Sequence, residues 1–228
     1  TLRNSSAASD VYKRQALGAA NLTLKDYLEA EKIYRNITSL KPNAENYYIY
    51  GNIHKQLKNY NEASEYFLKA INLKSDYSEA YNNLGNTKFR LGFIDEAVKN
   101  YKKAIKFNKK NFPAYFNLAH VYSEEKNFDD LKKVLQDVLK FDENNTTALN
   151  DLGYLNLILG NVDEGRKLFE KVINIDDKHI RAFKNYFLIT KVEKGNKFLK
   201  KLENIDLSKA NDEDKICLLY TSDAADEL

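Results

Sequence analysis

Asparagine side chains recur at a fixed spacing along the middle of the chain. One set follows a period of 34 residues and includes one aspartate: Asn83, Asn117, Asp151 and Asn185. A carboxamide carries donors and an acceptor, so it can hydrogen-bond the backbone amide of an extended peptide without contacting the peptide's side chains. The spacing therefore predicts a row of peptide-binding groups rather than one reactive centre.

Residue types that support catalysis or metal binding do not gather in the sequence. His179 lies beside Asp176 and Asp177, but no second histidine or cysteine joins them, as a zinc site would require. The glycines do not follow a predicted strand, as a phosphate-binding loop would. We therefore expect no catalytic residue, no metal and no cofactor. The histidines are His54, His120 and His179, and the one cysteine is Cys217.

The composition predicts a folded, mostly helical protein. The chain has 228 residues, 43% hydrophobic content, 16 Tyr and 12 Phe, and a net charge of only +3. This is enough apolar material for a core and differs from the low-hydrophobicity, highly charged composition of disordered chains. Two Pro and eight Gly leave few residues that break helices. No apolar run is long enough for a membrane-spanning helix.

The residues around the asparagines repeat with the same period. From Ser78 onward the chain carries Tyr81, Leu84, Gly85, Ala97, Tyr101 and Ala104, and the slots 34 residues earlier hold Tyr47, Tyr50, Gly51, Ala63, Phe67 and Ala70. The pattern resembles the tetratricopeptide repeat (TPR), a helix, a turn and a second antiparallel helix. The resemblance implies an all-α fold, a right-handed superhelical solenoid of about five to six repeats.

The predicted repeats fill most of the chain. A truncated first unit precedes four full repeats, and a degenerate unit and the start of a next helix follow them. Their boundaries are 16–43, 44–77, 78–111, 112–145, 146–179 and 180–216.

Two kinds of slot account for the packing and the turns. Slots are numbered from the first residue of each repeat, so that Gly85 is at the eighth slot and Ala97 at the twentieth slot of the 78–111 repeat. We expect small residues at these two slots, where the paired helices cross, and aromatic residues between units. Glycine and similar turn signals fall at one phase of each repeat: Lys58-Asn59, Leu91-Gly92, Lys126-Asn127 and Leu159-Gly160-Asn161. Glycine there permits the left-handed conformation that ends a helix.

The second, fifth, sixth, ninth and twelfth slots of the first helix turn away from the core and are predicted to form a concave groove. The sixth-slot row is similar to the asparagine ladder of O-linked N-acetylglucosamine transferases, as is the Asn-Leu-Gly-Asn run from Asn83 to Asn86. The resemblance implies a peptide bound along this row. The further residues predicted to line the groove are Asn52, Asn82, Asn86, Asn150 and Tyr154.

Another explanation of these asparagines stays open. Asparagine before Leu-Gly is common in this family whatever the protein binds, so the row could reflect local helix packing. The fifth slot lacks the lysine of a clamp for C-terminal carboxylates. It carries Tyr48, Asn82, Phe116 and Asn150 instead.

Both ends of the chain resemble translated sequencing adapter. A DNA strand of the adapter type encodes Ser5–Gln15, and its reverse complement encodes Cys217–Asp226. We therefore predict that residues 1–15 and 217–228 are adapter-derived and not native. The native segment would then be a fragment, with its own N-terminus missing.

The predicted function is a protein-protein interaction scaffold, not an enzyme, that binds an extended peptide or partner segment. The alternative is the non-catalytic TPR region of a larger sulfotransferase or glycosyltransferase; the sequence after the last repeat resembles that of bacterial TPR-fused sulfotransferases. We expect no nucleic acid, because acidic residues dilute the lysine clusters near Lys102 and Lys109. We expect a cytoplasmic, bacterial protein and leave its oligomeric state open.

Overall fold

The computed structural model describes residues 2–190 and 196–202, and gives side chains from residue 13 onward except at position 200. Within these ranges all regular secondary structure is α-helix, as the sequence predicts. The helices are α1 (Leu2–Thr23), α2 (Tyr27–Leu40), α3 (Ala44–Gln56), α4 (Tyr60–Leu73), α5 (Ser78–Arg90), α6 (Ile94–Phe107), α7 (Phe112–Glu124), α8 (Phe128–Phe141), α9 (Thr146–Ile158), α10 (Val162–Ile175), α11 (Ile180–Ile189) and α12 (Leu199–Leu202).

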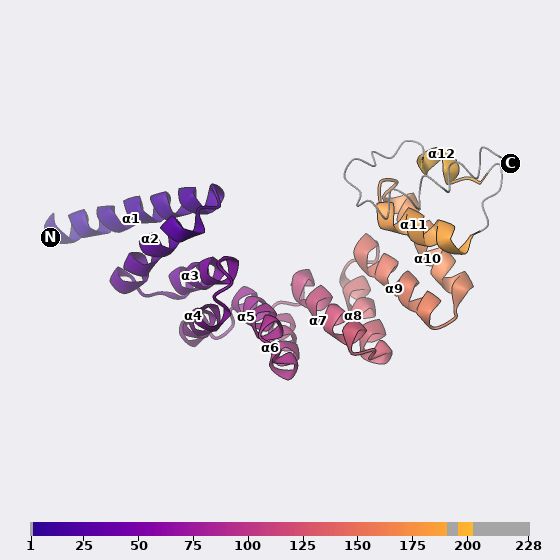
Figure 1. Cartoon of the computed structure of the whole chain (residues 1–228), viewed down its shortest axis with the longest axis horizontal. Coiled ribbons are helices and arrows are strands. Elements are labelled where there is room, and N and C mark those ends of the chain that lie inside the picture. The colour runs from indigo at the N-terminus through magenta and orange to yellow at the C-terminus, as the bar shows by residue number, and fades with distance from the viewer. Residues whose placement is uncertain (1, 191–195, 203–228) are drawn as a thin grey trace. The chain divides into compact units, whose positions relative to one another are not determined.

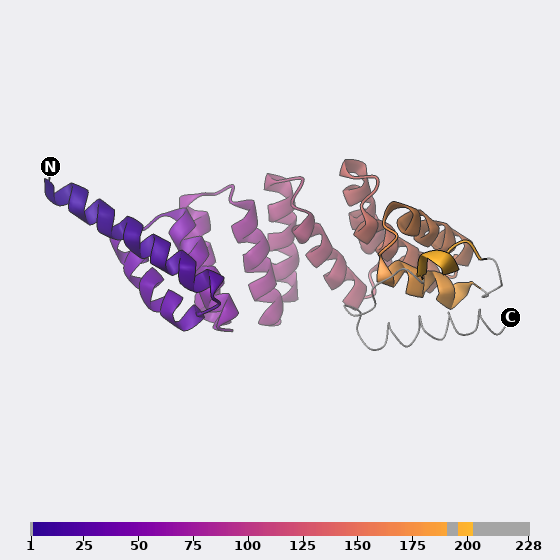
Figure 2. The ribbon, with the colours of Figure 1, turned by 90° about the horizontal axis from the view of Figure 1, so that it is seen from above.

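Consecutive helices pack as antiparallel pairs inside each of two compact units (Figure 1). The first unit comprises residues 1–121 and the second residues 122–228. Figure 2 shows the pairs α3–α4 and α5–α6 of the first unit and α9–α10 of the second from another side. The first helices α3, α5, α9 and α11 of the repeats begin at Ala44, Ser78, Thr146 and Ile180, whereas α1 begins at Leu2, before the first predicted unit.

Each unit has its own apolar core. In the first unit, one cluster surrounds Tyr34 and Ile53, and another surrounds Phe67 and Leu84. In the second unit a cluster forms around Phe183 and spans α9 to α12. These buried side chains come from the faces that the repeat pattern assigns to the interior.

The predicted turns adopt left-handed backbone conformations at one phase of each repeat. Gly92 and Gly160 have φ of +83° and +81°. Three lysines occupy the equivalent place: Lys25, Lys58 and Lys126, with φ of +59°, +62° and +55°. A residue with a side chain pays a steric cost there that glycine avoids.

Glycines at the eighth slot let an aromatic ring lie directly on the first helix. A Cβ atom on Gly85 would lie 2.6 Å from the ring of Tyr101, and one on Gly153 would lie 2.7 Å from that of Phe169. From the sequence, these rings are expected between repeats. They contact glycine within one repeat, between its first and second helices, and Phe67 and Phe169 also lie in apolar clusters with residues of the following repeat.

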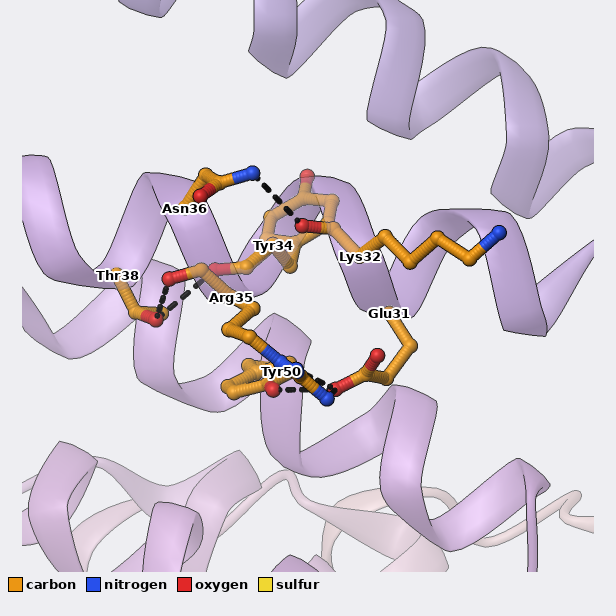
Figure 3. A network of polar contacts seen from close by, with 7 residues as sticks. All are labelled: Glu31, Lys32, Tyr34, Arg35, Asn36, Thr38 and Tyr50. Carbon is orange, nitrogen blue, oxygen red and sulfur yellow. Dashed lines mark hydrogen bonds and ion pairs between the residues drawn. The ribbon is translucent and has the colours of Figure 1, made fainter.

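A polar network joins α2 to α3 (Figure 3). Glu31 accepts a hydrogen bond of 2.6 Å from the Tyr50 hydroxyl and one of 2.9 Å from Nη2 of Arg35. Burial opposes ionisation of Glu31, but these two donors outweigh it and lower the pKa of the carboxyl. The network ties the first predicted repeat to the second.

An asparagine between repeats also fixes helix positions. Asn111 lies buried just before α7 and accepts a hydrogen bond from the backbone N–H of Ala114. Its amide donates to Ser78 Oγ, which donates to the backbone oxygen of Ala104. One side chain thus caps α7 and links it to α5 and α6.

Of the two predicted adapter boundaries, only the N-terminal one lies within the described residues. The boundary between residues 15 and 16 falls inside α1, and Gln15 donates a hydrogen bond of 3.1 Å to Asn46. Residues 217–228 lie outside the described residues, as do positions 191–195 and 203–216 of the predicted last repeat.

Candidate functional site

The sixth-slot residues, which we call the ladder residues, are Ile49, Asn83, Asn117, Asp151 and Asn185. They lie on α3, α5, α7, α9 and α11, the first helices of successive repeats. The three asparagines are engaged with side chains of the preceding repeat, not only with their own helix. The ladder is therefore partly built from interactions between repeats.

Asn83 is the centre of a cluster of four polar side chains in the first unit. Its amide donates to Asn52 Oδ1 at 2.9 Å and to the Tyr48 hydroxyl at 3.1 Å. Its oxygen accepts from Lys55 Nζ at 3.1 Å. Because lysine can only donate, Lys55 fixes the orientation of the carboxamide. Both ends of Asn83 are thus already used, and the side chain is buried.

Lys55 lies at the twelfth slot, in the last turn of α3, and is half-buried. Burial lowers the pKa of its ammonium. Among the described residues, its hydrogen bond to neutral Asn83 is its one polar contact, with no carboxylate partner. The twelfth slot belongs to the predicted groove, but this lysine is not among the residues predicted to line it.

The other ladder asparagines share a simpler arrangement. The Asn117 amide donates to Asn82 Oδ1 at 2.9 Å, and the Asn185 amide donates to Asn150 Oδ1 at 3.1 Å. Both bonds join residues 35 positions apart, from the sixth slot of one repeat to the fifth slot of the previous one. In each case the donor side of the carboxamide is held, while no described residue bonds the Asn117 or Asn185 oxygen.

The remaining predicted residues differ in their surroundings. Asn86 accepts a hydrogen bond of 2.8 Å from the Tyr101 hydroxyl and so supports its own repeat. Asp151 is half-buried and accepts a hydrogen bond of 3.3 Å from the Asn150 amide. Burial raises the pKa of Asp151, against the effects of Asn150 and of nearby Arg181. Tyr154 is 51% exposed.

The structure thus brings the predicted residues together in two sets. The first unit holds Asn52, Asn82, Asn83, Asn86 and Asn117, and the second holds Asn150, Asp151, Tyr154 and Asn185. Tyr48 and Lys55 join the first set. Their places in the repeat, the fifth and twelfth slots, could have marked them in the sequence as groove residues. Only the structure shows that both contact the Asn83 carboxamide.

The histidines do not form a metal site among the described residues, where no group of three or more His, Cys, Asp or Glu is placed to hold an ion. His179 instead caps α11, since its Nδ1 accepts from the backbone N–H of Ala182 at 3.1 Å. His54 is buried against the rings of Tyr50 and Tyr66. His120 is exposed and packs against Phe89.

A shallow open hollow lies on α6, away from the ladder residues. It is lined by Asp95, Val98, Lys99, Lys102, Lys103 and Lys106. One helix supplies all six side chains. Lys102, Lys103 and Lys106 therefore share one face of this helix, whereas Lys109 of the predicted basic cluster lies beyond its end.

Comparison with known families identifies the repeats. A model described as "TPR repeat" matches residues 51–92 and 86–125, and one described as "Tetratricopeptide repeat" matches residues 112–145 and 146–179. The matches together cover more than half of the chain. The chain belongs to the tetratricopeptide repeat family. As a TPR protein it is a protein-interaction scaffold, a class whose repeats are typically non-catalytic and bind protein or peptide partners.

Solved structures share the TPR fold with this chain. A crystal structure of MamA has a TM-score of 0.64 at 23% identity, covering 74% of this chain and 92% of that one. PilF of Pseudomonas aeruginosa has a TM-score of 0.67 at 14% identity, covering 95% and 90%. YrrB, described as "a TPR protein with an unusual peptide-binding site", has a TM-score of 0.58 at 20% identity, covering 73% and 86%.

These identities support the fold alone. The search of curated protein sequences found no match. Among the residues that the structure describes, no helix combines the length and the apolar character needed to cross a membrane.

Proposed function

We propose that this TPR protein binds extended peptide segments along the ladder residues of its first helices, within each unit. The proposal rests on the side chains of Asn117 and Asn185, each of which uses only its amide group in a hydrogen bond. Each amide is held by the preceding repeat, which leaves the oxygen with no partner among the described residues. An oxygen fixed in this way is a preorganised acceptor for a peptide N–H, so little side-chain entropy is lost on binding.

The neighbouring fifth-slot side chains support the same proposal. Asn82 and Asn150 use their oxygens to accept from the ladder, and no described residue accepts from the Asn82 amide. The Asn82–Asn117 pair therefore offers separate donor and acceptor groups, as a peptide backbone does. YrrB, a TPR protein of similar fold, is described as having a peptide-binding site.

The test selects peptides and then removes one carboxamide. A random peptide library displayed on phage is panned against the whole chain, and the strongest selected peptide is labelled for fluorescence anisotropy. We expect Asn117→Ala to weaken binding about fivefold, the loss of one hydrogen bond. The control is Asn100→Ala on α6, whose side chain bonds only its own helix at Glu96.

Two results would overturn the proposal. One is that wild-type protein selects no peptide. The other is that Asn117→Ala and Asn100→Ala bind the selected peptide equally well while both retain helical circular dichroism.

The fusion to a sulfotransferase or glycosyltransferase domain stays a prediction. Sequencing outward from the DNA that encodes Ala16 and Ile216 tests it directly.

A further inference from the structure

The outer face of α6 carries four exposed lysines, which we call the lysine face: Lys99, Lys102, Lys103 and Lys106. The buried residues of α6 lie on the opposite side of the helix. The lysines are spaced three or four residues apart, so each has like charges as its neighbours on the helix surface. Such pairs destabilise a helix, so packing within the protein does not explain this face.

The other repeats do not carry this charge at the same slots. The lysine face occupies the twenty-second, twenty-fifth, twenty-sixth and twenty-ninth slots of its repeat. In the 44–77 repeat these slots hold Glu65, Leu68, Lys69 and Asn72. In the 112–145 repeat they hold Lys133, Gln136, Asp137 and Lys140, and in the 146–179 repeat Lys167, Glu170, Lys171 and Asn174. The net charge of the four slots is therefore +4 on α6, 0 on α4 and +1 on α8 and on α10.

The charge of the lysine face is also poorly balanced within α6. On α8 and α10, lysines form ion pairs of 2.6 and 2.7 Å with acidic residues three positions earlier. On α6, Glu96 pairs instead with Lys88 of α5 at 2.9 Å. Within the described part of the chain, Lys99, Lys103 and Lys106 form no ion pair. The surface thus presents positive charge to whatever approaches it.

The sequence around α6 adds to this basic character. Six lysines lie within residues 99–110, because Lys109 and Lys110 follow the helix, and no acidic residue occurs between Ala97 and Ser123. Phe93, just before α6, is 51% exposed, and Phe107, its last residue, is 43% exposed. Clusters of four or more lysines with neighbouring aromatic residues are typical of surfaces that bind anionic lipids.

We propose that the lysine face of α6 binds the anionic headgroups of a membrane surface, as a peripheral contact separate from the proposed peptide site. The ammonium groups contact the negative headgroups, and Phe93 and Phe107 enter the boundary between headgroups and acyl chains. Each lysine near such a surface strengthens binding about fivefold. This contact requires no helix that crosses the membrane.

The residue types favour a lipid surface over a nucleic acid. Nucleic-acid sites commonly add arginines that bind phosphate as a fork, and aromatic ring faces on which bases stack. The α6 helix has no arginine. The ring of Phe107 is stacked on Tyr81, with 5.4 Å between centroids, and Lys88 lies over the ring of Phe93. Base stacking needs a free ring face, whereas insertion between lipids needs only exposed apolar surface.

The experiment measures co-sedimentation of the whole chain with lipid vesicles. Vesicles of phosphatidylcholine with about 30% phosphatidylserine are compared with vesicles of phosphatidylcholine alone. We expect wild type to bind only the anionic vesicles. Binding should fall as the salt concentration rises from about 0.1 M to about 0.5 M, because salt screens the attraction between exposed charges.

Two triple variants locate the contact. The test variant removes three charges from the lysine face: Lys99→Gln, Lys103→Gln and Lys106→Gln. The control removes three exposed lysines from the same three slots of other repeats: Lys167→Gln, Lys69→Gln and Lys140→Gln. We expect the vesicle partition coefficient to fall on the order of a hundredfold in the test variant and only about twofold in the control. Helical circular dichroism and binding of the selected peptide should be unchanged in both.

Three results would overturn the inference. The first is that wild type does not bind anionic vesicles. The second is an equal loss in the two triple variants, which would mean that net charge alone drives binding. The third comes from labelled single-stranded and duplex DNA tested in parallel: if wild type binds DNA but no vesicle, and the test variant loses that binding, the lysine face is a nucleic-acid site. None of these results bears on peptide binding, which Asn117→Ala tests separately.

Discussion

The two units place opposite charges at comparable sites of their first helices. In the first unit the half-buried Lys55 ammonium contacts the ladder residue Asn83. In the second, the ladder residue is itself a half-buried carboxylate, Asp151. The ninth slot also differs, with Asn52, Asn86 and the exposed His120 in the first unit but the exposed Tyr154 and Leu188 in the second.

The interior slots show no such difference. Gly85 lies under the ring of Tyr101 and Gly153 under that of Phe169, with nearly the same separation. The comparison indicates that packing fixes the repeat while the outward slots of the first helix carry its chemistry. Substitutions in the two kinds of slot should therefore behave differently.

The largest effect is expected where packing is tightest. Gly85→Ala and Gly153→Ala should each lower the free energy of unfolding by about 2 kcal/mol, because the new methyl group overlaps an aromatic ring. Urea denaturation of each variant measures this. The same slots of the 112–145 repeat hold Ala119 and Leu135.

The natural Ala–Leu pair supplies a control for that prediction. Gly85→Ala combined with Tyr101→Leu should recover part of the lost stability. Additive destabilisation in the double variant would show that the ring is not the cause.

His54 should make the first unit sensitive to acid. Burial lowers its pKa below the ordinary 6.5, against the attraction of Glu31 and Glu62, so the unfolded chain binds more protons just below that pH. Protonation of His54 therefore destabilises the fold as the pH falls below about 6.5. His54→Phe should weaken this dependence when thermal unfolding is followed from pH 7.5 to 5.

His54→Phe should also raise stability at neutral pH by about 1.5 kcal/mol. Neither ring nitrogen of His54 has a hydrogen-bond partner among the residues that the structure describes, and phenylalanine removes both polar atoms. A pH dependence as steep as that of wild type would mean that another group titrates.

Two substitutions at the turns should change the free energy of unfolding by smaller amounts and in opposite directions. Lys126→Gly should stabilise the chain by about 1 kcal/mol, because glycine adopts φ near +55° without steric cost. Gly92→Ala should destabilise it by a similar amount although nothing lies within 4 Å of the added Cβ. If chemical denaturation shows that both substitutions change the free energy of unfolding in the same direction, the backbone explanation is wrong.

The smallest changes in stability are expected at the two half-buried charged residues, Asp151 and Lys55. Burial raises the pKa of Asp151, so the native carboxyl holds its proton more tightly and loses stability as the pH rises above 3.8. Asp151→Asn should therefore raise the melting temperature slightly at pH 7 but not at pH 3. Lys55→Gln should also raise it slightly at pH 7, because the ammonium has no counterion.

The packing of each repeat could be predicted from the sequence, and the use of its polar side chains could not. Gly85 and Gly92 mark a crossing and a turn because few residues fit those backbone positions. Asn83 and Asn117 occupy one slot and look alike in the sequence, yet only Asn83 is saturated. That difference depends on partners 28 to 35 residues away and on a lysine whose place in a last helical turn is ordinary.

Nuclear magnetic resonance of the asparagine side-chain amides tests the central claim most directly. The selected peptide is titrated into the labelled chain, with resonances assigned through single Asn variants. We predict that the amides of Asn52, Asn82 and Asn117 shift until the peptide saturates, while that of Asn100 does not move. Shifts confined to α6, or absent from the first helices, would contradict peptide binding along the ladder residues.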